Sequence, residues 1–324
     1  MATSVRSLSG EARGAIVAVL GAAVLFGTSG TARELGPDDA SALAVGAVRI
    51  SIGTVVLWLM VLGERARGGA QVRVLGGGTR RWSLILLGAA GVAVYTPLFF
   101  VAVDRVGVAL GTVVTIASGP FFTGAIEATL LRRPPSRVWL VGTSITALGA
   151  ALLVSSGDGA GGQADALGIA AALASGLGYA VYSVTAKASI EDGLSSTLAL
   201  AAPFTVGAAV VVALASTQSF AWLATAQGVV MALYLGIFAT GFAYVLFGLG
   251  LRRLTPSTTV TLVLAEPITA SLLAVIVLDE MIAVVGWVGI TVVVAGLWLV
   301  GRDVALNPSA DPPIASNEGE PALR

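Results

Sequence analysis

The chain has 324 residues, of which 56% are hydrophobic and only 11% charged, and its formal net charge at pH 7 is zero. Soluble proteins carry about 25% charged residues, so this composition indicates a membrane protein and gives no basis for a nucleic-acid partner. The sequence contains no histidine and no cysteine, which excludes disulfides, cysteine-bound metals and histidine-based catalysis such as a Ser–His dyad. We expect no metal and no cofactor.

Apolar blocks of bilayer-spanning length follow one another along the chain. A transmembrane helix needs about 20 apolar residues, whereas the strands of a membrane β-barrel alternate polar and apolar residues over about 10 positions. The blocks are long and apolar all round, so they predict an all-α integral membrane protein with ten transmembrane helices. These are expected at about 14–32, 40–62, 82–103, 108–131, 137–155, 166–187, 196–216, 228–250, 256–278 and 284–301.

Polar segments flank and divide these blocks. Residues 1–13 read as a short cytoplasmic tail; a signal peptide is the alternative interpretation of the apolar run that follows. The Gly-rich segment 156–165 is expected to link two halves, 14–155 and 166–301. The tail 302–324 is rich in Pro, Ser and Glu and is expected to be disordered.

The basic residues predict the orientation of the chain. If the N-terminus is inside, every Lys and Arg lies at the inner side except Arg33 and Arg105, which lie outside, and Arg49, which lies within a span. Inner loops of membrane proteins carry such an excess of Lys and Arg. We therefore expect both termini in the cytoplasm and a plasma-membrane (inner-membrane) location.

The two halves resemble each other. Gly14–Arg33 aligns with Gly168–Lys187, and Pro120 aligns with Pro267. Because each half has five spans, the second must enter the membrane upside down relative to the first. Inverted repeats with Pro- or Gly-interrupted helices at matching positions are typical of secondary transporters. A duplicated bundle that keeps its prolines for packing is the alternative.

Glu266 and Pro267 lie together in the middle of one apolar run. A charge at the centre of a transmembrane helix costs about 2.5–3.5 kcal/mol on insertion scales, and the proline leaves the Val263 carbonyl without its usual donor. Burial favours the protonated carboxyl, so Glu266 could bind and release a proton, or contact the amine of an amino-acid-like substrate. A structural carboxylate, bonded to nearby hydroxyls or paired with a base, is the alternative. Thr259 lies on the same polar stripe.

Arg49 is the only basic residue expected inside a span. It could bind an anion, or pair with Glu266 at a similar depth in the membrane. The alternative is a structural arginine that caps carbonyls or extends its charge to the interface.

Other candidate cavity residues have packing alternatives. Tyr95 and Tyr244 occupy matched spans and could stack on or hydrogen-bond a substrate, although buried packing or a place in an interface belt explains them equally well. Tyr182 is a weaker cavity candidate. Thr115, beside Pro120, could face the cavity or form part of a line of small residues for close helix packing.

The chain resembles the EamA-type transporters of the drug/metabolite transporter superfamily. The resemblance rests on Ala47-Val48-Arg49, the mid-helix prolines 120 and 267, Leu278-Asp279-Glu280 and the glycine-spaced last span of each half. The first half departs from the family pattern at Leu131-Arg132-Arg133, where the family often has Gly-Glu. The resemblance implies a ten-helix basket around a central cavity, in which spans 5 and 10 lie to one side, and the movement of amino acids, other small metabolites or drugs.

We therefore expect a secondary transporter in the lipid bilayer that exports a small metabolite such as an amino acid, by alternating access around a midplane site. Protons and a second copy of the chain are further candidate partners. A non-transporting membrane sensor or assembly protein with the same fold is the alternative. The sequence has no Gly-Lys-Ser/Thr phosphate-binding loop, so an ATP-driven pump is not expected, nor is an enzyme.

Overall fold

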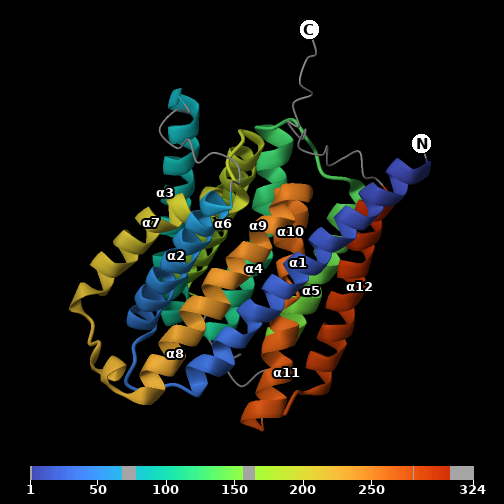
Figure 1. Cartoon of the computed structure of the whole chain (residues 1–324). Coiled ribbons are helices and arrows are strands. Elements are labelled where there is room, and N and C mark those ends of the chain that lie inside the picture. The colour runs from blue at the N-terminus through green and yellow to red at the C-terminus, as the bar shows by residue number, and fades with distance from the viewer. Residues whose placement is uncertain (1, 68–77, 156–164, 280, 307–324) are drawn as a thin grey trace.

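The structure is a computed structural model that describes residues 2–67, 78–155, 165–279 and 281–306. These residues form helices and no strands (Figure 1). The helices of the first half are α1 (Ala2–Glu34), α2 (Ala42–Ala66), α3 (Gly78–Val106), α4 (Val108–Thr129) and α5 (Arg137–Ser155). Those of the second half are α6 (Ala166–Glu191), α7 (Ser196–Leu214), η1 (Ala215–Thr217), η2 (Ala221–Ala224), α8 (Ala226–Gly236), η3 (Ile237–Phe242), α9 (Ala243–Arg253), α10 (Pro256–Val263), α11 (Glu266–Leu278) and α12 (Val284–Leu306).

Nine helical stretches of the described chain are long and apolar enough to cross a membrane. The remaining expected span is α4, which has 22 residues and at about 1.5 Å per residue is long enough for a bilayer core of about 30 Å. The predicted all-α membrane fold is confirmed. The count of ten spans holds only if α4 is included as the tenth.

Helix starts are fixed by local capping. Ser41, Asp165, Ser195 and Thr255 each precede a helix, and their side chains accept hydrogen bonds from backbone N–H groups of the first turn. These residue types satisfy N–H groups that have no partner within the helix. Pro256 follows Thr255 at the start of α10, where a missing N–H costs nothing.

Two boundaries differ from the sequence expectation. Helix α1 begins at Ala2, so it includes the segment expected to be a tail. Helix α12 continues to Leu306, past the expected end of the last span. The rest of the expected tail, and residues 156–164 of the expected linker, lie outside the described residues.

The two halves are interleaved. Helix α3 packs on α6, and α1 packs on α9, so the third membrane helix of each half contacts the first helix of the other. An ion pair accompanies each contact: Arg105 to Asp165 at 2.9 Å, and Arg253 to Glu11 at 3.1 Å. These pairs lie at opposite ends of the bundle, because α3 ends where α6 begins, and α9 ends where α1 begins (Figure 1).

The last helices of the halves, α5 and α12, pack against each other. A Cβ on Gly149 would lie 2.5 Å from the Val293 nitrogen, and a Cβ on Gly296 would lie 2.6 Å from the Thr146 nitrogen. Backbones this close exclude any side chain at these positions. The glycine spacing of the two spans therefore corresponds to a close helix seam.

Candidate functional site

A cavity of about 130 Å³ lies inside the bundle. Its walls come from α2, α3, α6, α7, η3 and α9. Arg49 is the only charged side chain in this lining, and most of the others are aromatic. The lining consists of Gly46, Arg49, Ile50, Val92, Tyr95, Thr96, Phe99, Phe100, Tyr182, Phe204, Thr240 and Tyr244.

Arg49 is held through one of its three guanidinium nitrogens. Its Nε donates to the Thr240 hydroxyl oxygen at 3.3 Å. Its two terminal nitrogens have no hydrogen-bond or ion-pair partner among the described residues. Arg49 therefore presents unused donors in the cavity. A salt bridge to Glu266, one of the alternatives considered for Arg49, is not formed within 4 Å in the described structure.

Thr240, the hydrogen-bond partner of Arg49, lies in a helical turn that is wider than an α-helical turn. Segment η3 is a π-helix between α8 and α9, and the Thr240 hydroxyl donates to the Leu235 carbonyl, five residues back, at 2.8 Å. The segment lies directly on α2, since a Cβ on Gly53 would lie 2.4 Å from the Thr240 Cγ2. Single π-turns inside α-helices are frequent at functional sites, and this one places a hydroxyl against Arg49.

Aromatic rings form much of the cavity wall. Tyr182 stacks on Phe247 with ring centroids 6.2 Å apart, and meets Phe204 and Tyr244 edge-on at 5.6 and 6.1 Å. Phe204 and Tyr244 are themselves 4.5 Å apart. Edge-to-face contacts of this kind stabilise a rigid cluster. The Tyr182 hydroxyl is buried and has no hydrogen-bond partner in the described part of the chain.

Glu266 lies beside the cavity, at a helix break. Helix α10 ends at Val263 and α11 begins at Glu266, and α1 comes so close that a Cβ on Gly27 would lie 2.6 Å from the Glu266 carbonyl oxygen. The carboxylate is part-buried and interacts electrostatically with Arg49 and Tyr95. It makes no hydrogen bond or ion pair with described residues. Pro267, the second residue of α11, predicted an interruption of the helix here, and the helix does break at this point.

The remaining predicted site residues lie outside the cavity lining. Pro120 is buried within α4, which continues through it without a break. The Thr115 hydroxyl donates to the Ala172 carbonyl at 3.3 Å, which joins α4 to α6. The Thr259 hydroxyl donates to the Thr255 carbonyl within its own helix. These contacts are those of helix packing, the alternative considered for Thr115.

The sequence interpretation missed several lining residues. Thr240 lies between glycines in an apolar run that predicts an ordinary α-helix, and the residue spacing of this run does not indicate a π-turn. Phe99 and Phe100 gave a weak signal as adjacent aromatics after Pro97. Phe204 had no distinguishing signal, because an apolar residue in an apolar span is equally consistent with lipid contact.

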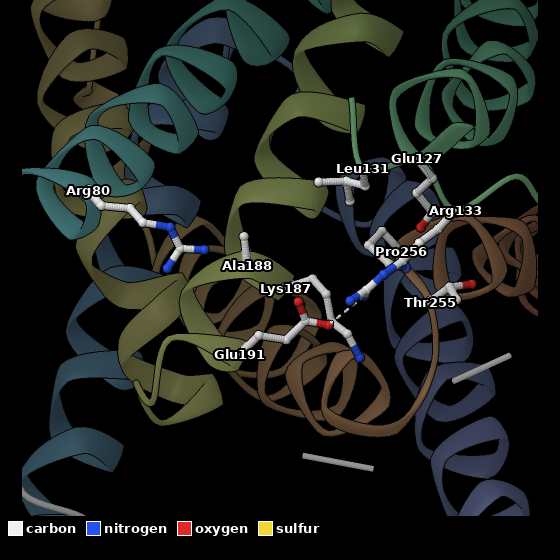
Figure 2. Close-up of a pocket in the computed structure, with 9 residues that line it drawn as sticks. All are labelled: Arg80, Glu127, Leu131, Arg133, Lys187, Ala188, Glu191, Thr255 and Pro256. Atoms are coloured by element: carbon white, nitrogen blue, oxygen red, sulfur yellow. Dashed lines mark hydrogen bonds and ion pairs between the residues drawn. The ribbon is translucent and has the colours of Figure 1, made fainter. Parts of the chain in front are cut away.

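A second cavity, of about 200 Å³, lies at the end of the bundle where α4 and α6 end and α10 begins (Figure 2). Arg133 of the first half pairs there with Glu191 of the second at 3.2 Å. Lys187 is buried and donates to the carbonyls of Leu251 and Leu254 at 2.9 and 3.0 Å. Lys187 therefore secures the end of α9, whereas the sequence indicated only a basic residue at the inner end of a span.

Glu127, which lines the same cavity, joins the halves directly. It is buried, and one carboxylate oxygen accepts from the Ser257 nitrogen at 3.0 Å, while the other accepts from the Ser257 hydroxyl. Nearby, Arg80 and Arg81 of α3 pair with Asp192. Polar contacts between the halves are thus concentrated at this end of the bundle.

Two inverted halves of membrane-spanning helices around a charged, aromatic-lined cavity define a multi-pass membrane protein of the transporter class. The EamA-like transporter family model matches residues 13–155 and 166–302, and the chain belongs to this family. It is 36% identical over 282 residues, covering 87% of this chain and 92% of the other, to a Bacillus subtilis (strain 168) protein described as "Uncharacterized transporter YwfM". A solved structure described only as "Crystal structure of protein" has a TM-score of 0.74 at 20% identity, and covers 90% of this chain and 98% of that one; it supports the fold.

Proposed function

We propose that the protein is a secondary transporter that exports a small metabolite, such as an amino acid, through the central cavity. The observation that carries this proposal is Arg49, whose terminal nitrogens have no protein partner among the described residues although it lies in a membrane-spanning helix. An unpaired cation at this depth is costly, and a bound substrate anion would offset that cost. Transport, and not catalysis, is the activity that this arrangement supports.

Transport by alternating access would rock the two halves around this cavity. Both termini would lie in the cytoplasm of an inner-membrane protein, as the basic residues suggest. The inter-half contacts at the Arg133–Glu191 end would then close the cytoplasmic side in this conformation. Homodimerisation is compatible with the many apolar side chains exposed on the outer surface of the bundle.

Glu266 is the residue we propose for proton coupling. It lies beside the cavity with no described hydrogen-bond partner and interacts electrostatically with Arg49. A proton taken up by Glu266 would change the field felt by Arg49, and thereby by a bound anion. Glu266→Gln keeps the size of the side chain and removes its charge, so it should abolish the pH dependence of transport; unchanged pH dependence would contradict the proton role.

The experiment that tests transport is a metabolite-resistance screen with the overexpressed protein, followed by efflux measurements on each hit. Arg49→Gln should abolish resistance and efflux at equal expression. Arg252→Gln is the matched control, because Arg252 is exposed at the end of α9, away from the cavity. Resistance that persists without measurable efflux would instead favour a membrane sensor or assembly role.

A further inference from the structure

We propose that the central cavity is built for small aromatic carboxylates that lack an ammonium group. This inference rests on the proposed transport function and narrows its substrate class. It departs from the expectation of an amino acid because it follows the charges that actually line the cavity.

The carboxylate follows from the way Arg49 is held. Thr240 engages Nε and leaves both terminal nitrogens to the cavity. A guanidinium offers parallel donors that match the two oxygens of a carboxylate, and such bidentate pairs are stronger and more directional than neutral hydrogen bonds. The Thr240 contact restricts rotation of the guanidinium plane, so the donors are oriented before a ligand binds.

The preference for a ligand without an ammonium group follows from the charge of the cavity lining, which is positive. No carboxylate lies among the residues that line the described cavity, and Arg49 would repel a second cation placed beside it. Glu266 lies next to the cavity but outside this lining. A desolvated ammonium would therefore lack an ion partner in the cavity, which opposes its entry from water.

The aromatic body follows from the walls and from the volume. Tyr95, Phe99, Phe204 and Tyr244 offer ring faces and edges, which favour a flat apolar partner. The volume of about 130 Å³ is close to that of an engineered cavity of about 150 Å³ that binds benzene. One six-membered ring with a short acid side chain is the appropriate size.

Tyr182 supplies a second polar contact. Its side chain lines the cavity and is only 1% exposed, and its hydroxyl has no partner in the described residues. Buried hydroxyls are almost always hydrogen-bonded. A ligand oxygen would satisfy this hydroxyl. The missing partner of Tyr182 is an observation independent of Arg49.

The test uses three probes with one carbon skeleton. Phenylacetate carries only the acid, 2-phenylacetamide replaces it with a neutral amide, and phenylglycine adds an ammonium group. Binding to the purified full-length protein is measured by calorimetry and by thermal stabilisation. We expect phenylacetate to bind at least tenfold more tightly than either of the other probes.

Two variants locate the binding. Arg49→Gln should weaken phenylacetate at least tenfold, and Tyr182→Phe should weaken it several-fold. The matched controls Arg252→Gln and Tyr234→Phe should bind phenylacetate normally, since neither residue lines the cavity. Should a cavity variant fail to fold, protection of Arg49 from an arginine-modifying reagent by phenylacetate, in the unmutated protein, gives the same information.

The results that would overturn the inference differ from those that would overturn transport. Phenylglycine binding as tightly as phenylacetate, especially if lost in Glu266→Gln, would restore an amino-acid substrate. Amide binding equal to the acid, or no effect of Arg49→Gln, would remove the carboxylate site. Tight phenylacetate binding without flux in proteoliposomes would leave the ligand class standing and contradict the transport function.

Discussion

Arg49 stands in a membrane-spanning helix with only one hydrogen bond to a described residue, so the orientation of its guanidinium group depends strongly on a single hydroxyl. The 3.3 Å bond to Thr240 is a long one, yet hydrogen bonds to charged groups contribute about 1.5–3 kcal/mol. Thr240, which positions the charge, can therefore be tested by mutation just as Arg49 can.

Thr240→Val keeps the shape of the side chain and removes the oxygen that accepts from Arg49. We expect it to raise the KM of the substrate found by the screen about tenfold, equivalent to about 1.4 kcal/mol, and to lower the melting temperature, because Arg49 loses an acceptor and the Leu235 carbonyl loses a donor. Thr240→Ser retains the hydroxyl and should restore KM. A normal KM in Thr240→Val would show that Arg49 is oriented without this contact.

Asp165 is a second residue whose charge has a local task. Its carboxylate accepts from Arg105 and from the Leu167 nitrogen, and these bonds, the arginine first, lower the pKa of Asp165 below its ordinary value. A lowered folded-state pKa means that the stabilisation is present at neutral pH and is lost as pH falls through the folded-state pKa. Asn also serves as an N-cap, so Asp165→Asn removes the charge and keeps the cap.

The melting temperature of Asp165→Asn should therefore lie slightly below that of the unmutated protein at pH 7. The two values should converge as acid protonates Asp165. A difference that persists at acid pH would assign the effect to capping geometry and not to the charge. Because Asp165 is partly exposed to solvent, the difference at pH 7 should also shrink at high salt.

At the scale of the helical elements, the sequence predicted those features that depend on composition and on single residues with strong local rules. Apolar block length predicted the spans, and Pro267 predicted a break. Pro120 carries the same signal, yet α4 continues through it, because a proline removes one hydrogen bond and the neighbouring helices decide whether the rest persist. The π-turn at Thr240 was not predictable, since it packs against Gly53 on a helix far away in the sequence.

The α5–α12 seam can be tested by adding one methyl group. Gly149→Ala places a Cβ 2.5 Å from the Val293 nitrogen, so the helices must separate; overpacking of this kind costs about 1–3 kcal/mol. We expect a clearly lower melting temperature in detergent. Gly301→Ala, whose Cβ would meet no atom within 4 Å, is the control and should be neutral or slightly stabilising. Equal stability of the two variants would contradict a close seam.

In the whole molecule, the ion pairs between the inverted halves are of two kinds: those with an equivalent at the other end of the bundle, and those without one. The ion pairs Arg105–Asp165 and Arg253–Glu11 join equivalent helices at opposite ends of the bundle. If the halves exchange shapes during transport, each pair takes the place of the other and both can persist. No equivalent of the Arg133–Glu191 pair appears at the other end of the described bundle, so this contact is expected to open. Exposed ion pairs contribute only about 0–1 kcal/mol, which suits a contact that breaks in every cycle.

Alternating access requires the cavity to open to each side of the membrane in turn, and a chain without cysteine allows a direct measurement. Thr96→Cys places one thiol in the cavity lining, and its reaction with a membrane-impermeant maleimide is followed from each face of oriented vesicles. An exposed control, Arg252→Cys, should react from one face only and identify it. We predict that the thiol at position 96 reacts from both faces, and that adding Glu191→Gln speeds its reaction from the Arg252 face. Reaction from a single face, unaffected by Glu191→Gln, would contradict alternating access.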